Sequence, residues 1–311
     1  MALLQPLVEK SNLGESRSGS IFYWDRETGE KKVEKVYGDF FVKLLYSSRV
    51  GGLVADGIFA NRWVSKLAGA FQSSNLSRAR ISSFIRDFEI PMQEFETKSY
   101  TSFNDFFVRK FNLGTRPFVD DPSVLPAFAE ARYLGFDKVG AHQKFPVKGK
   151  DLSAESVLGG LSFGPAFTGG PVLIARLCPV DYHRFHFPDD GMIRSDHRIT
   201  GKFHSVNPVA LRGKSDIFAT NERHVNLLET EHFGKIAYVE VGALCVGKIV
   251  QSHPWSKPFK RGDEKGYFLF GASTVIIFGQ PGKWVPDADI LKNTADKMET
   301  FVKLGQSVGH A

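Results

Sequence analysis

The segment GYFLFGASTVIIFG, Gly266–Gly279, holds two apolar runs separated by small and hydroxyl-bearing residues. The runs, residues 267–270 and 275–278, are rich in aromatic and β-branched side chains, which favour a pleated, half-buried surface. We therefore predict a buried strand that residues 271–274, Gly-Ala-Ser-Thr, interrupt. A bulge would explain the interruption, because glycine weakens the hydrogen-bonding ladder of a strand. The segment does not match the GxSxG turn of serine hydrolases.

Outside this segment, the chain divides into a helical part and a β-rich part. Apolar residues recur at three- and four-residue spacing over residues 39–86, which is typical of helices. The stretch SFNDFFVRKF predicts a further helix, capped by Ser102 with Asp105 three residues later. Short apolar runs with frequent glycine and proline predict strands over residues 126–278. The expected fold class is α+β, a helical N-terminal region followed by a β-rich core.

We expect three regions along the chain. Residues 1–38 form an N-terminal extension, in which IFYWDRETGEKKVEKVYG predicts a small hairpin around a Thr-Gly turn. Residues 39–115 form a helical region whose apolar faces either pack on the protein's own core or contact lipid. Residues 116–311 form the β-rich core, in which the stretch 288–310 predicts a short helix followed by a strand.

Composition narrows the classes of partner. The 311 residues carry a formal charge of +6 and 28 phenylalanines, without the basic, aromatic-interleaved run typical of nucleic-acid binders. A mild positive excess with many aromatics suits an anionic membrane surface as well as it suits an ordinary basic protein. The sequence has no apolar run of about 18 residues and no signal-peptide core, so any membrane contact is expected to be peripheral. Cys178 and Cys245 lie in apolar stretches, which favours buried thiols over a disulfide.

The stretch DYHRFHFP contains two histidines, His183 and His186. Flanking prolines at positions 179 and 188 leave little room for a helix, so the two rings are expected to point to different neighbours. A shared zinc site is not expected, because the chain has neither HExxH nor CxxC. Glu130 is the one acid in LPAFAEARYLGF. It either lies in water at a strand edge or is kept among small and apolar residues for a functional role. A serine, a histidine and an acid are compatible with a catalytic triad, although almost any chain contains them.

Several of these segments together resemble the phosphatidylserine decarboxylase proenzymes. The segments TSFNDFFVRKF with RPF, DYHRFHFP, VEVGALCVGKI, EKGYFLFGAST and the terminal LGQSVG occur in the order of that family. They cover about residues 100–309, and the nearest pattern is that of bacterial proenzymes with FGGST at the processing site.

The resemblance implies that the protein cuts its own Ala272–Ser273 bond. Ser273 would attack the carbonyl of Ala272, His186 would take the serine proton, and Glu130 would orient the imidazole. Elimination and hydrolysis would then convert Ser273 into a pyruvoyl group, the covalent cofactor of the family. The products would be a beta chain, residues 1–272, and an alpha chain that begins with the pyruvoyl.

The same resemblance implies the second reaction. The pyruvoyl ketone would form a Schiff base with the amine of phosphatidylserine and accept the electrons released with CO₂, giving phosphatidylethanolamine. His183 is the candidate for a role in decarboxylation or reprotonation. The expected partners are phosphatidylserine in the membrane and the other chain of the same precursor, with a homodimer left open, no nucleic acid and no metal. The expected location is the cytoplasmic face of the cell membrane, as a peripheral protein.

Two positions depart from the family pattern. Ala272 replaces the usual glycine before the serine, and its Cβ narrows the backbone angles allowed at the scissile bond. The family's Pro-Ala-Asp segment is replaced by PAFAEAR. Alignment on Pro126 places Phe128 at the acid position, whereas alignment on Arg132 places Glu130 there, and we prefer the second alignment.

These departures leave other hypotheses open. One is an unprocessed homologue that binds lipid surfaces without catalysis, and another is a pyruvoyl decarboxylase of a free amino acid. A serine hydrolase unrelated to the family is a third. The amphipathic helices disfavour a soluble substrate, and the intact Ser273, His183 and His186 disfavour a non-catalytic protein.

Overall fold

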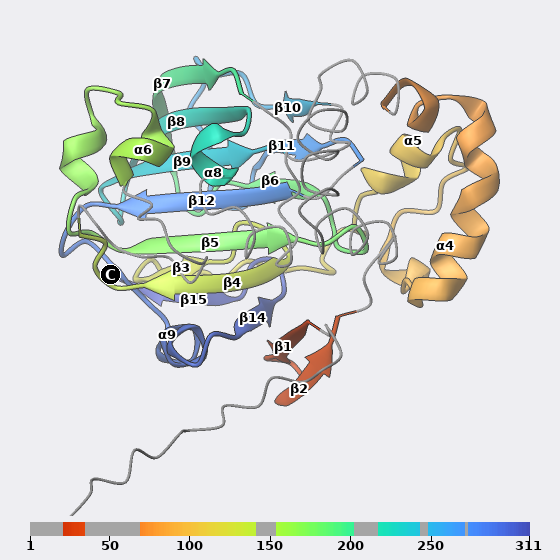
Figure 1. Ribbon diagram of the computed structural model, residues 1–311, viewed down its shortest axis with the longest axis horizontal. Helices are drawn as coiled ribbons and strands as arrows, with labels where there is room; N and C mark the ends of the chain where they lie inside the picture. The colour runs from red at the N-terminus through yellow and green to blue at the C-terminus, as the bar shows by residue number, and fades with distance from the viewer. Residues whose placement is uncertain (1–20, 35–68, 141–153, 202–216, 243–247, 271–272) are drawn as a thin grey trace, which may run out of the picture.

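The computed structural model describes residues 21–34, 69–140, 154–201, 217–242, 248–270 and 273–311. A nine-stranded sheet forms the centre of the molecule (Figure 1). Every strand pair in it is antiparallel except the pair β1–β14. In spatial order its strands are β2 (Glu30–Val33), β1 (Phe22–Asp25), β14 (Glu299–Val302), β4 (Ala131–Phe136), β5 (Val172–Leu177), β12 (Ser273–Gly279), β9 (Lys235–Val241), β8 (Arg223–Thr230) and β7 (Gly191–Ile199).

Two small sheets and several short helices surround the large sheet, which confirms the predicted α+β class. The small sheets have the strand orders β10 (Ile249–Gln251), β11 (Glu264–Phe268), β6 (Arg184–His186) and β13 (Val285–Pro286), β15 (Ser307–His310), β3 (Val124–Pro126). The described residues include the α-helices α4 (Ile81–Phe88), α5 (Phe103–Phe107), α6 (Ala154–Leu158), α8 (Ile217–Thr220) and α9 (Ala288–Ala295). The 3₁₀ helices are η2 (Asn75–Arg80), η3 (Met92–Glu94) and η4 (Gly164–Phe167).

Strand β12 lies in the middle of the core. All seven of its residues are buried, between β5 on one side and β9 on the other. Its run Val275–Phe278 is apolar on both faces, the pattern of a central strand that is covered on both sides. The second apolar run of the opening segment therefore lies in a fully buried strand of the large sheet.

The two apolar runs of that segment do not form one interrupted strand, so this interpretation was wrong. The first run begins within β11, as its last two residues, Tyr267 and Phe268. Strand β11 pairs with β10 and β6 in a small sheet, whereas β12 belongs to the large sheet. Of the four small residues between the runs, Ser273 and Thr274 begin β12, and residues 271–272 lie outside the described residues. Local residue types favour strand on both sides of the break, but they do not specify which partners each strand will find.

The described helical part packs as an aromatic cluster against the end of the large sheet. In Figure 1, α4 and α5 lie at the end where β5 finishes and β12 begins. The cluster includes Phe84 of α4, Phe103 and Phe107 of α5, and Phe270 and Tyr182 from the core. These contacts place α5 against Phe270, three residues before the start of β12.

Helix α5 begins at the cap that the sequence predicts. The predicted cap is confirmed, because Ser102 Oγ accepts the backbone N–H of Asp105 at 3.1 Å. Predicted helices over residues 39–68 lie outside the described residues. Within the described part of the chain, no helix is both long and apolar enough to cross a bilayer.

The N-terminal hairpin of the described chain joins the large sheet, whereas the last strand, β15, lies in a small sheet. The predicted hairpin is confirmed by the antiparallel pair β1–β2, and β1 also pairs in parallel with β14, so the hairpin extends the core sheet. The predicted C-terminal helix and strand are confirmed as α9 followed by β14 and β15. The division into regions 1–38, 39–115 and 116–311 stays a prediction.

Candidate active site

Ser273 is the first residue of β12 and is completely buried. Its Cα pairs with Leu177 at the end of β5, so the chain enters β12 at the same end of the sheet where it leaves β5. Among the described residues, no group forms a hydrogen bond with Ser273 Oγ. A buried hydroxyl without a partner is costly, and such exceptions often mark reactive positions. Ala272, the other residue of the expected cleavage site, lies outside the described residues.

A tight turn follows β5 and leads to the first histidine, His183. The Asp181 carboxylate accepts the backbone N–H of Cys178 at 2.6 Å, and Asp181 N–H donates to the Cys178 carbonyl at 2.9 Å. Arg132 of β4 donates to the same carboxylate at 2.5 Å. Burial raises the pKa of Asp181 to about 6, although the charge of Arg132 opposes that shift. The turn is thus held by a buried ion pair and by its own hydrogen bonds.

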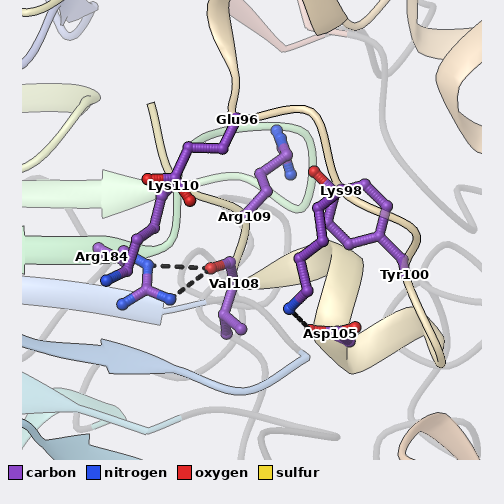
Figure 2. Close-up of a pocket in the computed structure, with 8 residues that line it drawn as sticks. All are labelled: Glu96, Lys98, Tyr100, Asp105, Val108, Arg109, Lys110 and Arg184. Atoms are coloured by element: carbon purple, nitrogen blue, oxygen red, sulfur yellow. Dashed lines mark hydrogen bonds and ion pairs between the residues drawn. The ribbon is translucent and has the colours of Figure 1, made fainter. Parts of the chain in front are cut away.

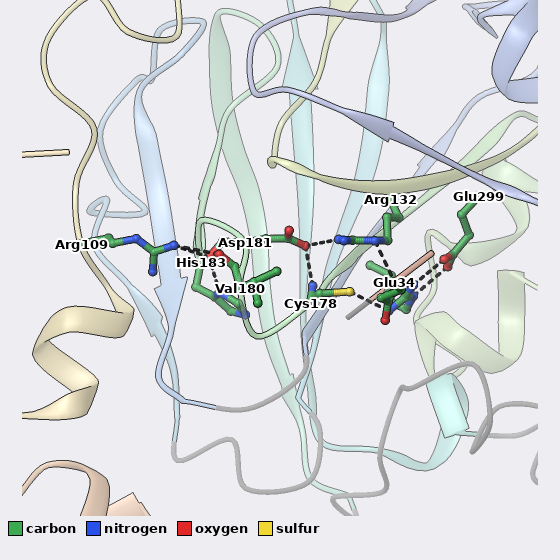
Figure 3. Close-up of polar contacts among 9 residues, drawn as sticks. Glu34, Arg109, Arg132, Cys178, Val180, Asp181, His183 and Glu299 are labelled. Carbon is green, nitrogen blue, oxygen red and sulfur yellow. Dashed lines mark hydrogen bonds and ion pairs between the residues drawn. The ribbon is translucent and has the colours of Figure 1, made fainter. Parts of the chain in front are cut away.

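The ion pair at Asp181 belongs to a buried chain of charges (Figure 3). Arg132 also lies 3.0 Å from Glu34, which follows β2, and Glu34 pairs with Arg176 of β5 at 2.6 Å. Arg176 in turn pairs with Glu299 of β14. The network ties the N-terminal hairpin to the strands beneath the candidate site, and sequence reasoning did not find it.

His183 is completely buried beside α5. Its Nδ1 lies 3.0 Å from the carbonyl oxygen of Asp181, and its ring centroid lies 3.9 Å from that of Phe107. Because a carbonyl oxygen only accepts, Nδ1 carries a proton in this contact. The His183 carbonyl also accepts the backbone N–H of Phe268 at 2.9 Å, which joins the turn to β11.

His186 lies at the end of β6 and meets different neighbours, as predicted. Its Nδ1 donates to the carbonyl of Gly262 at 2.8 Å, and its Nε2 lies 3.5 Å from the Tyr182 hydroxyl. Burial lowers the pKa of His186 below its usual value, so the ring is neutral at pH 7. Its backbone N–H donates to the carbonyl of Phe128 at 2.8 Å. The arrangement supplies a neutral imidazole whose Nε2 carries a lone pair that can accept a proton.

Glu130 is buried but forms no direct hydrogen bond with His186; both side chains belong to the described part of the chain. Its two carboxylate oxygens accept from Arg116 Nε at 2.6 Å and Nη2 at 3.0 Å, and one of them accepts the Leu304 N–H at 3.2 Å. Glu130 is connected to His186 through the chain: Phe128, two residues before Glu130, accepts the backbone N–H of His186. The Phe128 ring packs between Tyr133 and Tyr238, so that position supplies an apolar side chain and a carbonyl.

Asn104 is a site residue that sequence reasoning missed. Its Oδ1 accepts the backbone N–H of Phe270 at 2.7 Å, and its Nδ2 donates to Ser73 Oγ at 2.9 Å. A lone amide in the phenylalanine-rich helix SFNDFF was the available signal, because a buried amide needs partners. It anchors the chain three residues before Ser273.

Comparison with known proteins gives one family. The family model described as phosphatidylserine decarboxylase matches residues 103–310. A protein of Clostridium novyi (strain NT), named phosphatidylserine decarboxylase proenzyme, is 39% identical over 279 residues, 89% of this chain and 95% of the relative. Proteins of the same name from Clostridium kluyveri and Fusobacterium nucleatum subsp. nucleatum are each 38% identical over 93% of this chain, and 98% and 97% of the relatives are covered.

Proposed function

This chain belongs to the phosphatidylserine decarboxylase family, and we propose that it is a proenzyme that cuts its own Ala272–Ser273 bond and then decarboxylates phosphatidylserine. The products of the second reaction are phosphatidylethanolamine and CO₂. The observation that carries the proposal is Ser273 Oγ, buried and without a partner among the described residues, at the start of a central strand. The turn after β5, which holds His183, leaves the sheet at the same end.

Self-cleavage needs a nucleophile and a base. Ser273 Oγ attacks the carbonyl carbon of Ala272, and the peptide C–N bond breaks to leave an ester and a free amine. Loss of the Cα proton of Ser273 then breaks the Cβ–Oγ bond and releases the Ala272 carboxylate. The remaining dehydroalanine takes up water and loses ammonia, which leaves a pyruvoyl group at the head of residues 273–311.

We assign the base to His186. Its Nδ1 proton is committed to the Gly262 carbonyl and burial keeps the ring neutral, so Nε2 is the atom that accepts the serine proton. Glu130 is proposed as the acid that supports this base. Its contacts with Arg116 and Leu304 hold the segment whose Phe128 carbonyl fixes the His186 backbone.

The pyruvoyl group fits the surroundings of Ser273. The position is buried, and among the described residues its hydroxyl has no hydrogen-bond partner, so a group without a hydroxyl donor suits it. The ketone of that group supplies an electron sink: it takes up the electron pair of the bond between the substrate's α-carbon and its carboxylate when CO₂ leaves. His183, fixed by the Asp181 carbonyl, is proposed to return a proton to the substrate carbon.

Membrane contact at the helical region is part of the proposal. Leu76 of η2 and Leu113 after α5 are large apolar side chains exposed to solvent. A lipid surface would cover them, and the substrate is a membrane lipid. Leu76→Ser should weaken sedimentation with phosphatidylserine vesicles, whereas Val285→Ser, an exposed valine of β13, should leave it unchanged. Equal sedimentation of both variants would contradict this surface.

Intact-mass measurement of the purified full-length chain tests the central proposal. We expect one mass for residues 1–272 and another for residues 273–311 with an N-terminal pyruvoyl. Ser273→Ala should give one uncut chain without decarboxylase activity, whereas Ser82→Ala, an exposed serine of α4, should cleave normally. A single uncut wild-type chain after long incubation with phosphatidylserine vesicles would overturn the pyruvoyl mechanism.

A further inference from the structure

A cavity of about 260 Å³ lies beside the candidate site, between the loop before α5 and strand β6. Its lining contains four cationic side chains and two acidic ones. The lining residues are Glu96, Lys98, Tyr100, Asp105, Val108, Arg109, Lys110 and Arg184. Figure 2 shows Arg109 in the middle of this group, between the Lys98–Asp105 pair and the pair formed by Arg184 and Val108.

Two of the four cations have anionic partners. Lys98 pairs with Asp105 at 2.5 Å. Arg184 pairs with Glu264 at 2.7 Å and also donates to the Val108 carbonyl. Arg109 and Lys110 form no ion pair within the described chain, and Lys110 is exposed. Glu96 is the one other carboxylate of the lining, so the cavity keeps an excess of positive charge.

Arg109 is the unusual group in this lining, because its side chain is buried without a carboxylate. It is 3% exposed, and its Nη2 donates to the carbonyls of Val180 at 2.8 Å and Asp181 at 3.3 Å. Its Nε and Nη1 have no acceptor among the described residues. The rings of Phe95 and Phe106 lie 4.5 and 4.9 Å from the guanidinium carbon.

The guanidinium keeps its charge in this environment. Burial lowers the pKa of Arg109 to about 10, which still leaves it protonated at pH 7. Buried donors without acceptors are costly, and an anion would satisfy them with charge-assisted hydrogen bonds. The aromatic rings stabilise the charge but do not accept its remaining N–H bonds in the way an oxygen does.

We propose that this cavity binds a phosphate group, with Arg109 as the inner recognition residue and Lys110 as the outer one. Guanidinium groups match the oxygens of phosphate, and lysine adds a mobile charge. The cavity is larger than a phosphate needs, so it has room for groups esterified to it. The inference rests on the proposed function for the identity of the ligand: the phosphodiester of phosphatidylserine, with free inorganic phosphate as the other source.

The position of Arg109 links this site to His183. The Asp181 carbonyl accepts both from Arg109 Nη2 and from His183 Nδ1 (Figure 3). A head-group phosphate bound at Arg109 would therefore be close to His183, the histidine proposed to return the proton, because both side chains bind the same carbonyl oxygen. Arg109 acts on that histidine as a positioning residue, through the carbonyl.

Binding is measured on the full-length Ser273→Ala protein, so that the result does not depend on cleavage. Calorimetric titrations use inorganic phosphate, glycerophosphoserine and free serine as probes. We expect the two phosphate compounds to bind and serine not to bind. Arg109→Gln should weaken binding about tenfold or more, and Lys110→Gln about two- to threefold. Lys235→Gln, which removes an exposed charge at the start of β9, should have no effect.

The outcomes separate the two sources and the two proposals. If inorganic phosphate inhibits the mature enzyme competitively with phosphatidylserine and Lys110→Gln raises KM, the head group is the ligand. If phosphate binds without inhibiting, the site takes free phosphate. Absence of saturable phosphate binding, or equal weakening by Lys110→Gln and Lys235→Gln, overturns the inference even when cleavage is normal. Phosphate binding in a wild-type chain that does not cleave would leave the inference standing and remove the proposed function.

Discussion

The side-chain oxygen of Asn104 accepts the backbone N–H of Phe270 at 2.7 Å, across 166 positions of sequence. The contact joins α5 to the chain just before Ser273. Phe270 also packs its ring 5.1 Å from both Phe103 and Phe107 of the same helix. One helix therefore holds the approach to the expected scissile bond by a hydrogen bond and by aromatic packing, and it also contacts His183 through Phe107.

Loss of this hydrogen bond should slow self-cleavage. Asn104→Ala leaves a buried N–H without an acceptor, a cost of about 1–3 kcal/mol, and frees the segment that presents the bond. We expect cleavage about tenfold slower, measured as the fraction of cut chain over time after a pulse of synthesis. Asn75→Ala, at an exposed asparagine of η2, is the control. Cleavage at the wild-type rate in a folded Asn104→Ala protein would contradict the anchoring role.

Glu130 and Arg116 allow a test that separates catalysis from stability. Glu130→Gln removes one charge of a buried ion pair and should lower the free energy of unfolding by about 2 kcal/mol, because Arg116 loses this carboxylate but keeps Glu94 at 2.7 Å. In the double variant Glu130→Gln/Arg116→Gln, both charges are gone and only the partly exposed Glu94 loses its partner, so much of that stability should return. If Glu130 supports the base, cleavage stays slow in the double variant. Recovery of cleavage together with stability would reduce Glu130 to a structural residue.

The pH dependence of cleavage should report on His186. A base must be unprotonated, and burial lowers the pKa of this histidine below its usual value of 6.5. The cleavage rate of newly synthesised chain should therefore rise with pH below 6.5 and be level from about pH 7 to 8. His186→Asn should abolish cleavage, and the exposed His310→Asn should not. A midpoint above pH 7 would rule out His186 as the base in its present environment.

Glu34 should make stability depend on acid pH. Burial alone would raise its pKa, but the charges of Arg176 and Arg132 prevail and lower it to about 2 from 4.5. A carboxyl with a lowered folded pKa stabilises fully above its unfolded pKa, and this stability is lost as pH falls from about 4.5 towards 2. The shift corresponds to about 3 kcal/mol.

The test of Glu34 is chemical denaturation across pH 2.5–7. Glu34→Gln should be less stable than wild type at pH 7, and the difference should shrink towards pH 2.5. Glu30→Gln, at an exposed position of the same hairpin, should show no such trend. A difference that stays constant with pH would mean that the charge of Glu34 is not what its partners stabilise.

Short-range features were predictable because their causes are local. Ser102 caps α5 through an N–H three residues away, and the apolar run Val275–Phe278 forms a buried strand because no polar side chain interrupts it. The separate neighbours of His183 and His186 followed from extended backbone between prolines. In each case the residues that decide the outcome lie within one turn or one strand.

The sequence by itself determined the α+β class, the hairpin, the cap and the expectation of Ser273, His183 and His186 as site residues. Only the tertiary structure decided that the segments on either side of Ser273 enter different sheets, that Arg116 takes the carboxylate of Glu130, and that Arg109 is buried with unsatisfied donors. The physical reason is the same in all three cases. Strand partners, ion pairs and the desolvation of a charge depend on residues far apart in sequence, and packing alone brings those residues together.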